Sequence, residues 1–210
     1  MTQESLSLSN ITEMNITTWN APDVNYWGIP KCGNTSIKLA LLNPSDSLIA
    51  QEETKLFEGK GNTRFLKTTS KWVHYSPIAS RYISDKDAID NGKENFTVIR
   101  NPIERFKSQY VYNLKARLEP IMMIDHLIEH MRQPDKCLNI NFRTQHHFIS
   151  RDGVVIPEIY RLDDLTILKS RLGTTIPHVN TANIEIALKG YQITAVESIF
   201  AQDFELYESR

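Results

Sequence analysis

The chain has little cysteine and no long apolar run. Its 210 residues include only Cys32 and Cys137, too few for a disulfide framework and too far apart for a Cys-x-x-Cys pattern. No apolar stretch reaches the roughly 20 residues that cross a bilayer. Residues 1–18 are polar and lack the basic start and apolar stretch of a secretory signal. We therefore expect a reduced, cytoplasmic protein without a membrane anchor.

The chain also lacks an excess of either charge. Its 24 basic and 25 acidic residues give a net charge of −1, which argues against a general nucleic-acid binder but permits a local basic pocket. The sequence contains no internal repeat, low-complexity tract or Pro/Gly/Ser-rich linker. We expect a poorly ordered polar lead-in at residues 1–20 and a single domain at 21–210. The oligomeric state stays open.

Strand and helix patterns alternate along the chain. The expected strands are residues 24–29, 64–73, 95–99 and 154–162, with a charged, turn-rich segment at 45–61. The expected helices are residues 35–42, a segment opening at Ser76 and Pro77, a segment opening at Asn101, residues 121–131, a short segment from Asp163 to Lys169, and an amphipathic segment at 195–207. This alternation predicts an α/β fold with a central, mostly parallel sheet flanked by helices.

The first strand runs into the sequence PKCGNTS and then a helix capped by Asn34 or Thr35. Gly33 lets the backbone approach an anion, and the first N–H groups of the helix favour negative charge. Lys31 adds a full positive charge. The loop is not the ATP-binding GxxxxGK[ST] pattern, because Lys31 precedes Gly33. Local physics alone also allows an ordinary strand–helix turn with an exposed lysine.

A second turn follows the strand at 95–99. Arg100 stands at the carboxyl end of that strand, where open α/β sheets bind ligands. Asn101, Pro102 and Glu104 form a strong helix start. The helix places Ser108 off its apolar stripe, so Arg100 and Ser108 could hold a second phosphate. A solvated helix face with an arginine at the strand end is the plain alternative. The expected apolar stripe consists of Ile103, Phe106, Tyr110 and Leu114.

The two turns together resemble the sulfotransferases that use 3′-phosphoadenosine 5′-phosphosulfate (PAPS), especially the carbohydrate O-sulfotransferase branch. PKCGNTS is similar to that family's 5′-phosphosulfate loop, PKCGSTS, and VIRNPIERFKSQY is similar to its 3′-phosphate element, VRDPxERxxSxY. Weaker similarities follow at residues 145–148, 160–165 and 200–207, so the resemblance spans about residues 26–207. The departures are Asn34 for Ser, Asn101 for Asp, and Leu162, Asp163 and Asp164 for Phe, Glu and Asn.

The resemblance implies a P-loop-like three-layer fold and an enzyme. It implies in-line transfer of a sulfuryl group from PAPS to an acceptor hydroxyl, leaving 3′,5′-ADP, without a metal. A glycan, a small metabolite, a lipid headgroup and a protein tyrosine all offer such a hydroxyl, and the resemblance to the carbohydrate branch favours a glycan. Lys31 would be catalytic and would neutralise charge on the departing phosphate. The implied donor-binding residues are Lys31, Cys32, Gly33, Asn34, Thr35, Ser36, Arg100 and Ser108.

The acceptor hydroxyl needs a general base, and histidine suits neutral pH. His74 follows the expected strand at 64–73, at a point similar to the catalytic histidine of some relatives. A structural histidine is the alternative. Weaker candidates for the base are His146, His147, Glu52, Glu53 and Glu58. Cys32 is discounted as a nucleophile, since sulfuryl transfer in the family is direct.

Other functions stay open from the sequence. His126, Glu129 and His130 fit the HxxEH pattern of zinc peptidases, with both histidines on one helical face. A P-loop-type nucleotide-binding protein or kinase is a second alternative. A catalytically silent sulfotransferase-like module that only binds a partner is a third.

Overall fold

A computed structural model describes residues 18–42, 82–116, 123–177 and 185–210. The strands are β1 (Thr18–Asn20), β2 (Val24–Trp27), β3 (Glu94–Ile99), β4 (Ser150–Arg151), β5 (Val154–Val155) and β6 (Glu158–Arg161). The helices are α1 (Asn34–Ala40), α4 (Asp85–Asp90), α5 (Pro102–Ala116), α6 (Ile124–His130), η2 (Asp135–Cys137), α7 (Gln145–Ile149), α8 (Thr166–Leu172), α9 (Gly190–Ile199) and α10 (Ala201–Glu208).

The main sheet has the strand order β1-β2-β3-β6. β3 pairs in parallel with β2 on one side and with β6 on the other, whereas β1 is an antiparallel edge strand. The four residues of β2 and the last four of β3 are buried, as expected for strands covered on both faces. The predicted α/β fold with a mostly parallel central sheet flanked by helices is therefore confirmed.

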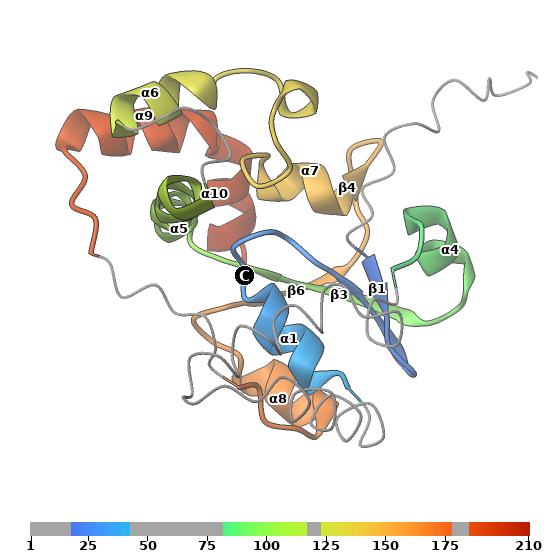
Figure 1. Ribbon diagram of the computed structural model, residues 1–210. Helices are drawn as coiled ribbons and strands as arrows, with labels where there is room; N and C mark the ends of the chain where they lie inside the picture. Colours follow the sequence, from blue (N-terminus) through green and yellow to red (C-terminus); the bar gives the residue numbers. More distant parts are fainter. Residues whose placement is uncertain (1–17, 43–81, 117–122, 178–184) are drawn as a thin grey trace, which may run out of the picture.

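Helices cover both faces of this sheet (Figure 1). On one face, Ile37 of α1 and Leu168 of α8 pack with Phe96 of β3. On the other face, Phe148 of α7 and Leu206 of α10 pack with Ile99 of β3 and Ile159 of β6. The sheet is thus the middle layer of three, which fits the P-loop-like fold of the sequence-based prediction.

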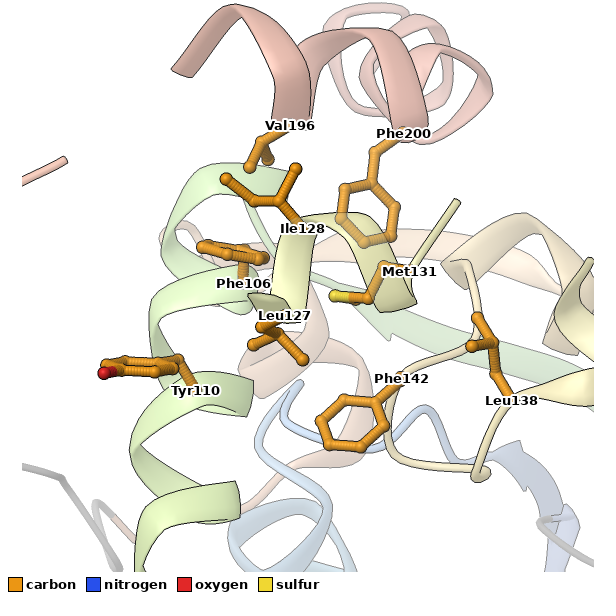
Figure 2. Packing of buried hydrophobic residues seen from close by; sticks show 9 residues of the cluster. All are labelled: Phe106, Tyr110, Leu127, Ile128, Met131, Leu138, Phe142, Val196 and Phe200. Carbon is orange, nitrogen blue, oxygen red and sulfur yellow. The ribbon is translucent and has the colours of Figure 1, made fainter. Parts of the chain in front are cut away.

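A third apolar cluster lies beside the sheet and fixes α5 against α6 and α9 (Figure 2). Phe106 and Tyr110 of α5 meet Leu127 of α6 and Val196 of α9. Burying side chains of this size contributes about 1.5–3 kcal/mol each, so this cluster holds α5 in place. The cluster members are Phe106, Tyr110, Leu127, Ile128, Met131, Leu138, Phe142, Val196 and Phe200.

Helix α5 begins as the sequence predicted. The Asn101 side-chain oxygen accepts hydrogen bonds from the backbone N–H groups of Ile103 and Glu104, at 3.0 and 3.2 Å. The predicted apolar stripe is wrong at its end, however, because Leu114 is exposed and Val111 is buried instead. The sequence could not show that the last turns of α5 bury the side that carries Val111.

Other expected elements differ at their ends. The strand expected at 154–162 is two strands, since Pro157 separates β5 from β6 and lacks the N–H that a ladder needs. The C-terminal helix expected at 195–207 is likewise two helices, α9 and α10, which meet at Phe200. The cap expected from Asn34 or Thr35 is wrong, because Gly33 is the N-cap of α1.

Several expectations fall outside the described residues. These are the strand at 64–73, the helix opening at Ser76 and Pro77, and the charged segment at 45–61. The expected lead-in ended at residue 20, and the structure places residues 18–20 in β1, where Trp19 is fully buried. None of the helices within the described ranges is long and apolar enough to cross a membrane.

The Asn101 cap gives a prediction for stability. Asn101→Ala removes the side-chain acceptor of two backbone N–H groups, so the free energy of unfolding should fall by about 1 kcal/mol. Asn101→Asp keeps the acceptor and should stay near the wild-type value. Urea denaturation of the three proteins measures the difference, and an unchanged midpoint in Asn101→Ala would show that the cap contributes nothing.

Candidate functional site

The two turns lie at the same edge of the sheet. β2 and β3 are parallel neighbours, with Trp27 paired to Thr97, so the segments that follow them leave the sheet at one carboxyl edge. The two segments are in contact there, because the Arg100 Nη1 atom lies 3.5 Å from the Lys31 carbonyl oxygen. The structure therefore brings together the two turns that the sequence selected separately.

The backbone of the first turn is tightly bent. Lys31 and Gly33 both have a left-handed conformation, with φ of 69° and 80°. A Cβ atom at Gly33 would lie 2.8 Å from Cδ1 of Leu162, the residue after β6. Glycine is therefore favoured at position 33 by its conformation, which costs an L-residue about 1–2 kcal/mol, and by the close approach of Leu162.

The residues after Gly33 begin α1, and Gly33 itself is the N-cap. The Asn34 oxygen accepts a 2.7 Å hydrogen bond from the Tyr26 hydroxyl of β2, so this side chain is turned back toward the sheet. Thr35 is half-buried and Ser36 is buried, and both make interactions within the protein. Since Gly33 has no side chain, the first N–H groups of α1 have no cap from the N-cap residue.

Lys31 lies among other cations. Its Nζ atom is 3.8 Å from the centre of the Tyr112 ring, on the third turn of α5. Burial, followed by the charges of Arg100 and Arg105, lowers the pKa of Lys31 to about 8. The lysine is thus partly buried rather than the exposed residue of a plain turn. A bound anion would offset this repulsion among the cations.

Arg100 and Ser108 belong to the second turn and its helix. The Arg100 guanidinium lies 3.8 Å from the Glu104 carboxylate, which also pairs with Lys107 at 2.8 Å. The Arg100 side chain is about one-third exposed, so a ligand can still reach it. Ser108 is partly exposed on α5, and its contact with a phosphate stays a prediction.

Arg105 ties the turns together, and the sequence analysis assigned it no role. It is 1% exposed, and its Nε atom donates to the Pro30 carbonyl oxygen at 3.1 Å, immediately before Lys31. Its Nη2 atom donates to the Arg143 carbonyl oxygen at 2.8 Å. No local pattern could have found it, because both partners lie on distant segments of the chain.

Cys32 is held inside the protein. Its thiol donates to the Gln145 Oε1 atom at 3.1 Å, and its backbone N–H donates to the Ile29 carbonyl oxygen at 3.2 Å. Burial raises the pKa of the thiol to about 11, so no thiolate nucleophile forms near neutral pH. Its contact with a donor stays a prediction, and the structure shows it as an anchor of the first turn.

The candidates for the general base are divided. His74, Glu52, Glu53 and Glu58 lie outside the described residues. His146 Nδ1 is 3.1 Å from Ser150 Oγ, and His147 Nε2 is 3.2 Å from Arg143 Nη1. Both described histidines thus have neighbours around α7.

The HxxEH residues lie on α6. His126 is exposed, whereas the His130 ring packs edge-on against Phe142 with a centroid distance of 5.9 Å. Across the described ranges, no group of three His, Cys, Asp or Glu side chains is arranged to hold a metal ion.

Fold and site together define an α/β protein with two cation-bearing turns at the carboxyl edge of a parallel sheet. A family model described as the sulfotransferase family matches residues 16–149, which is more than half of the chain and includes both turns. The chain belongs to the sulfotransferase family and is thus expected to transfer sulfuryl groups. Comparison with the curated proteins and with the solved structures gave no match.

The buried position of Lys31 predicts a pH-dependent stability. The folded pKa is about 8 and the ordinary value is 10.5, so the unfolded chain binds more protons between these pH values and stability rises across that window. Lys31→Met should therefore be more stable than wild type at pH 7, with a gap that shrinks as pH rises from about 8 to 10.5. Chemical denaturation at several pH values measures the gap.

Lys31→Arg is the matched control for that experiment. Its guanidinium stays charged throughout the range, so its difference from Lys31→Met should not shrink. A constant gap between wild type and Lys31→Met would contradict a lowered pKa at Lys31.

Proposed function

We propose that the chain is a PAPS-dependent O-sulfotransferase that transfers a sulfuryl group to a carbohydrate hydroxyl. The observation that carries the proposal is the contact between the Arg100 guanidinium and the Lys31 carbonyl oxygen, because it joins two separate anion-holding turns into one site. The match to the sulfotransferase family supports it. The carbohydrate acceptor rests on the resemblance of both motifs to the carbohydrate branch.

The charges of the site fit such a donor. PAPS carries a phosphosulfate at its 5′ end and a separate phosphate at its 3′ position, so it needs positive charge at two points. Lys31 on the first turn and Arg100 on the second supply it. The pKa of Lys31 is lowered by Arg100, Arg105 and Lys115 in addition to burial, which indicates a cluster of positive charge that a polyanion would stabilise.

The residues of the two turns would have separate roles in holding the donor and in the transfer. The Lys31 ammonium would stabilise negative charge on the departing phosphate oxygen. The bent backbone at Gly33, with the Thr35 and Ser36 hydroxyls, would hold the 5′-phosphate, and Arg100 with Ser108 would hold the 3′-phosphate. When bound, PAPS supplies the sulfuryl group and its phosphate leaving group. During in-line transfer the protein would chiefly position the donor and the acceptor and stabilise charge, by analogy with phosphoryl transfer.

His74 is the proposed general base. It would take the proton of the acceptor hydroxyl as the oxygen attacks. Histidine can accept a proton near neutral pH, and the neighbours of His146 and His147 around α7 make those two residues weaker candidates.

Ligand preference tests the proposed donor. The wild-type protein should gain more thermal stability from 3′,5′-ADP than from 5′-AMP, because only the first ligand has a phosphate for Arg100. Arg100→Ala should abolish that preference, and a contact with a charged group predicts a loss of about 1.5–3 kcal/mol in binding free energy. Differential scanning fluorimetry followed by calorimetric titration measures both effects.

A wild-type protein that does not distinguish the two ligands would exclude the proposed donor. Magnesium-dependent binding of ATP in its place would favour the P-loop-type nucleotide-binding protein or kinase. Binding of 3′,5′-ADP without transfer to any acceptor would favour a silent module.

The proposed base is tested by substitution. His74→Gln should lower transfer of labelled sulfate from PAPS to a panel of glycan acceptors by about 100-fold or more, while leaving the affinity for 3′,5′-ADP unchanged. The control is His126→Gln, since His126 is exposed on α6 and should have no effect on transfer. If His74→Gln keeps wild-type turnover, another residue is the base.

A further inference from the structure

One buried carboxamide contacts both turns. Gln145 is the first residue of α7 and is fully buried. Its Oε1 atom accepts hydrogen bonds from the Cys32 thiol of the first turn at 3.1 Å and from the Arg100 backbone N–H of the second turn at 2.9 Å. Its Nε2 atom donates to the Arg100 carbonyl oxygen at 2.9 Å. A single side chain therefore links the two segments directly.

The Gln145 carboxamide pairs with the backbone of Arg100 where no neighbouring strand does so. Pairing of β3 with β6 reaches the Ile99 carbonyl oxygen, which accepts from the Leu162 N–H at 2.8 Å. At the next residue, the Gln145 carboxamide takes both the N–H and the carbonyl oxygen of the backbone. A carboxamide has one acceptor oxygen and two N–H donors, so it can satisfy the backbone N–H and carbonyl oxygen of Arg100, as a residue of a paired strand would. Gln145 thus fixes the backbone where the strand gives way to α5.

The backbone that carries the carboxamide is itself held in position by α10. The backbone N–H groups of Gln145 and His146 each donate to the buried Asp203 carboxylate of α10, both at 2.8 Å. Thr144 caps α7 by accepting from the His147 N–H at 3.2 Å. With its backbone fixed at the start of α7, Gln145 has little freedom to follow a displaced turn. Its hydrogen bonds therefore connect both turns to a fixed point at the start of α7.

On the basis of the proposed function, we propose that Gln145 is a positioning residue that fixes the separation of the two turns and so determines the preference for a ligand with phosphates at both ends. A ligand with one phosphate uses one turn and is insensitive to their separation. A ligand with two phosphates gains the second contact fully only where the turns are already correctly spaced. Losing the link should therefore weaken the two-phosphate ligand selectively.

The fold supplies a second tie that should keep a Gln145 variant folded. Arg105 binds the Pro30 carbonyl oxygen of the first turn from α5, independently of Gln145. The chain also supplies a matched control, Gln109 of α5. Gln109 is likewise fully buried, and its Nε2 atom donates at 2.7 Å to the Asn141 carbonyl oxygen, which belongs to neither turn.

The experiment compares the affinities for 3′,5′-ADP and 5′-AMP by calorimetric titration in wild type, Gln145→Met and Gln109→Met. Methionine keeps the approximate volume and removes the hydrogen bonds. Gln145→Met should lower the affinity ratio of the two ligands by about tenfold, the effect of losing about 1.4 kcal/mol. Gln109→Met should lose stability but keep the wild-type ratio.

Gln145→Glu gives an independent readout. A protonated carboxyl can both donate and accept a hydrogen bond, as the carboxamide does here, whereas a carboxylate cannot donate to the Arg100 carbonyl oxygen. The ligand preference of Gln145→Glu should therefore recover toward the wild-type value at the same pH when the pH is lowered. A purely structural role predicts no such recovery, and this variant also serves if Gln145→Met fails to fold.

The outcomes separate the two proposals. A wild-type protein without any preference for 3′,5′-ADP contradicts the proposed function and this inference together. A wild-type preference that persists in Gln145→Met, or a loss of both ligands in equal proportion, overturns the role of Gln145 and leaves the proposed function standing.

Discussion

The parallel pairing of β2 with β3 is the constraint on which the site depends. It brings the ends of both strands to one edge of the sheet, so that Lys31 and Arg100 are neighbours although they are far apart in sequence. β2 and the last four residues of β3 are buried, and a slip of one residue would exchange the side chains that pack on the two faces of the sheet. The common edge at which the two turns lie is therefore a consequence of sheet packing.

Buried polar side chains fix the backbone of the two turns more closely than the sheet does alone. Arg105, Gln145 and Asp203 are each at most 1% exposed, and burying such groups costs free energy unless they are hydrogen-bonded. Their partners are mostly backbone groups of the two turns and of α7. Burial raises the pKa of Asp203, while Arg105 and the two N–H groups of α7 act in the opposite direction. The hydrogen bonds of these three side chains thus offset the cost of burying them and define the backbone geometry around the site.

Local signals predicted the parts of the fold that depend on neighbouring residues. The Asn101 cap, the strand ending at Ile99 and the helix after it follow from hydrogen bonding and propensity within a few positions. The end of the α5 stripe was wrong, since burial of Val111 rather than Leu114 depends on partners that local periodicity does not show. Arg105 was missed for the same reason. Its partners, the carbonyl oxygens of Pro30 and Arg143, lie on distant segments of the chain.

The sequence alone located two candidate anion-holding turns, because a glycine bend, a lysine, an arginine and a helix cap are local features that can be read in order. Only the tertiary structure decided that the turns meet, that Lys31 is partly buried among cations, and that Asn34 faces Tyr26 rather than capping α1. It also decided that Gln145 joins Cys32 to Arg100. These features arise from contacts across the sheet, where distance in space is independent of distance along the chain.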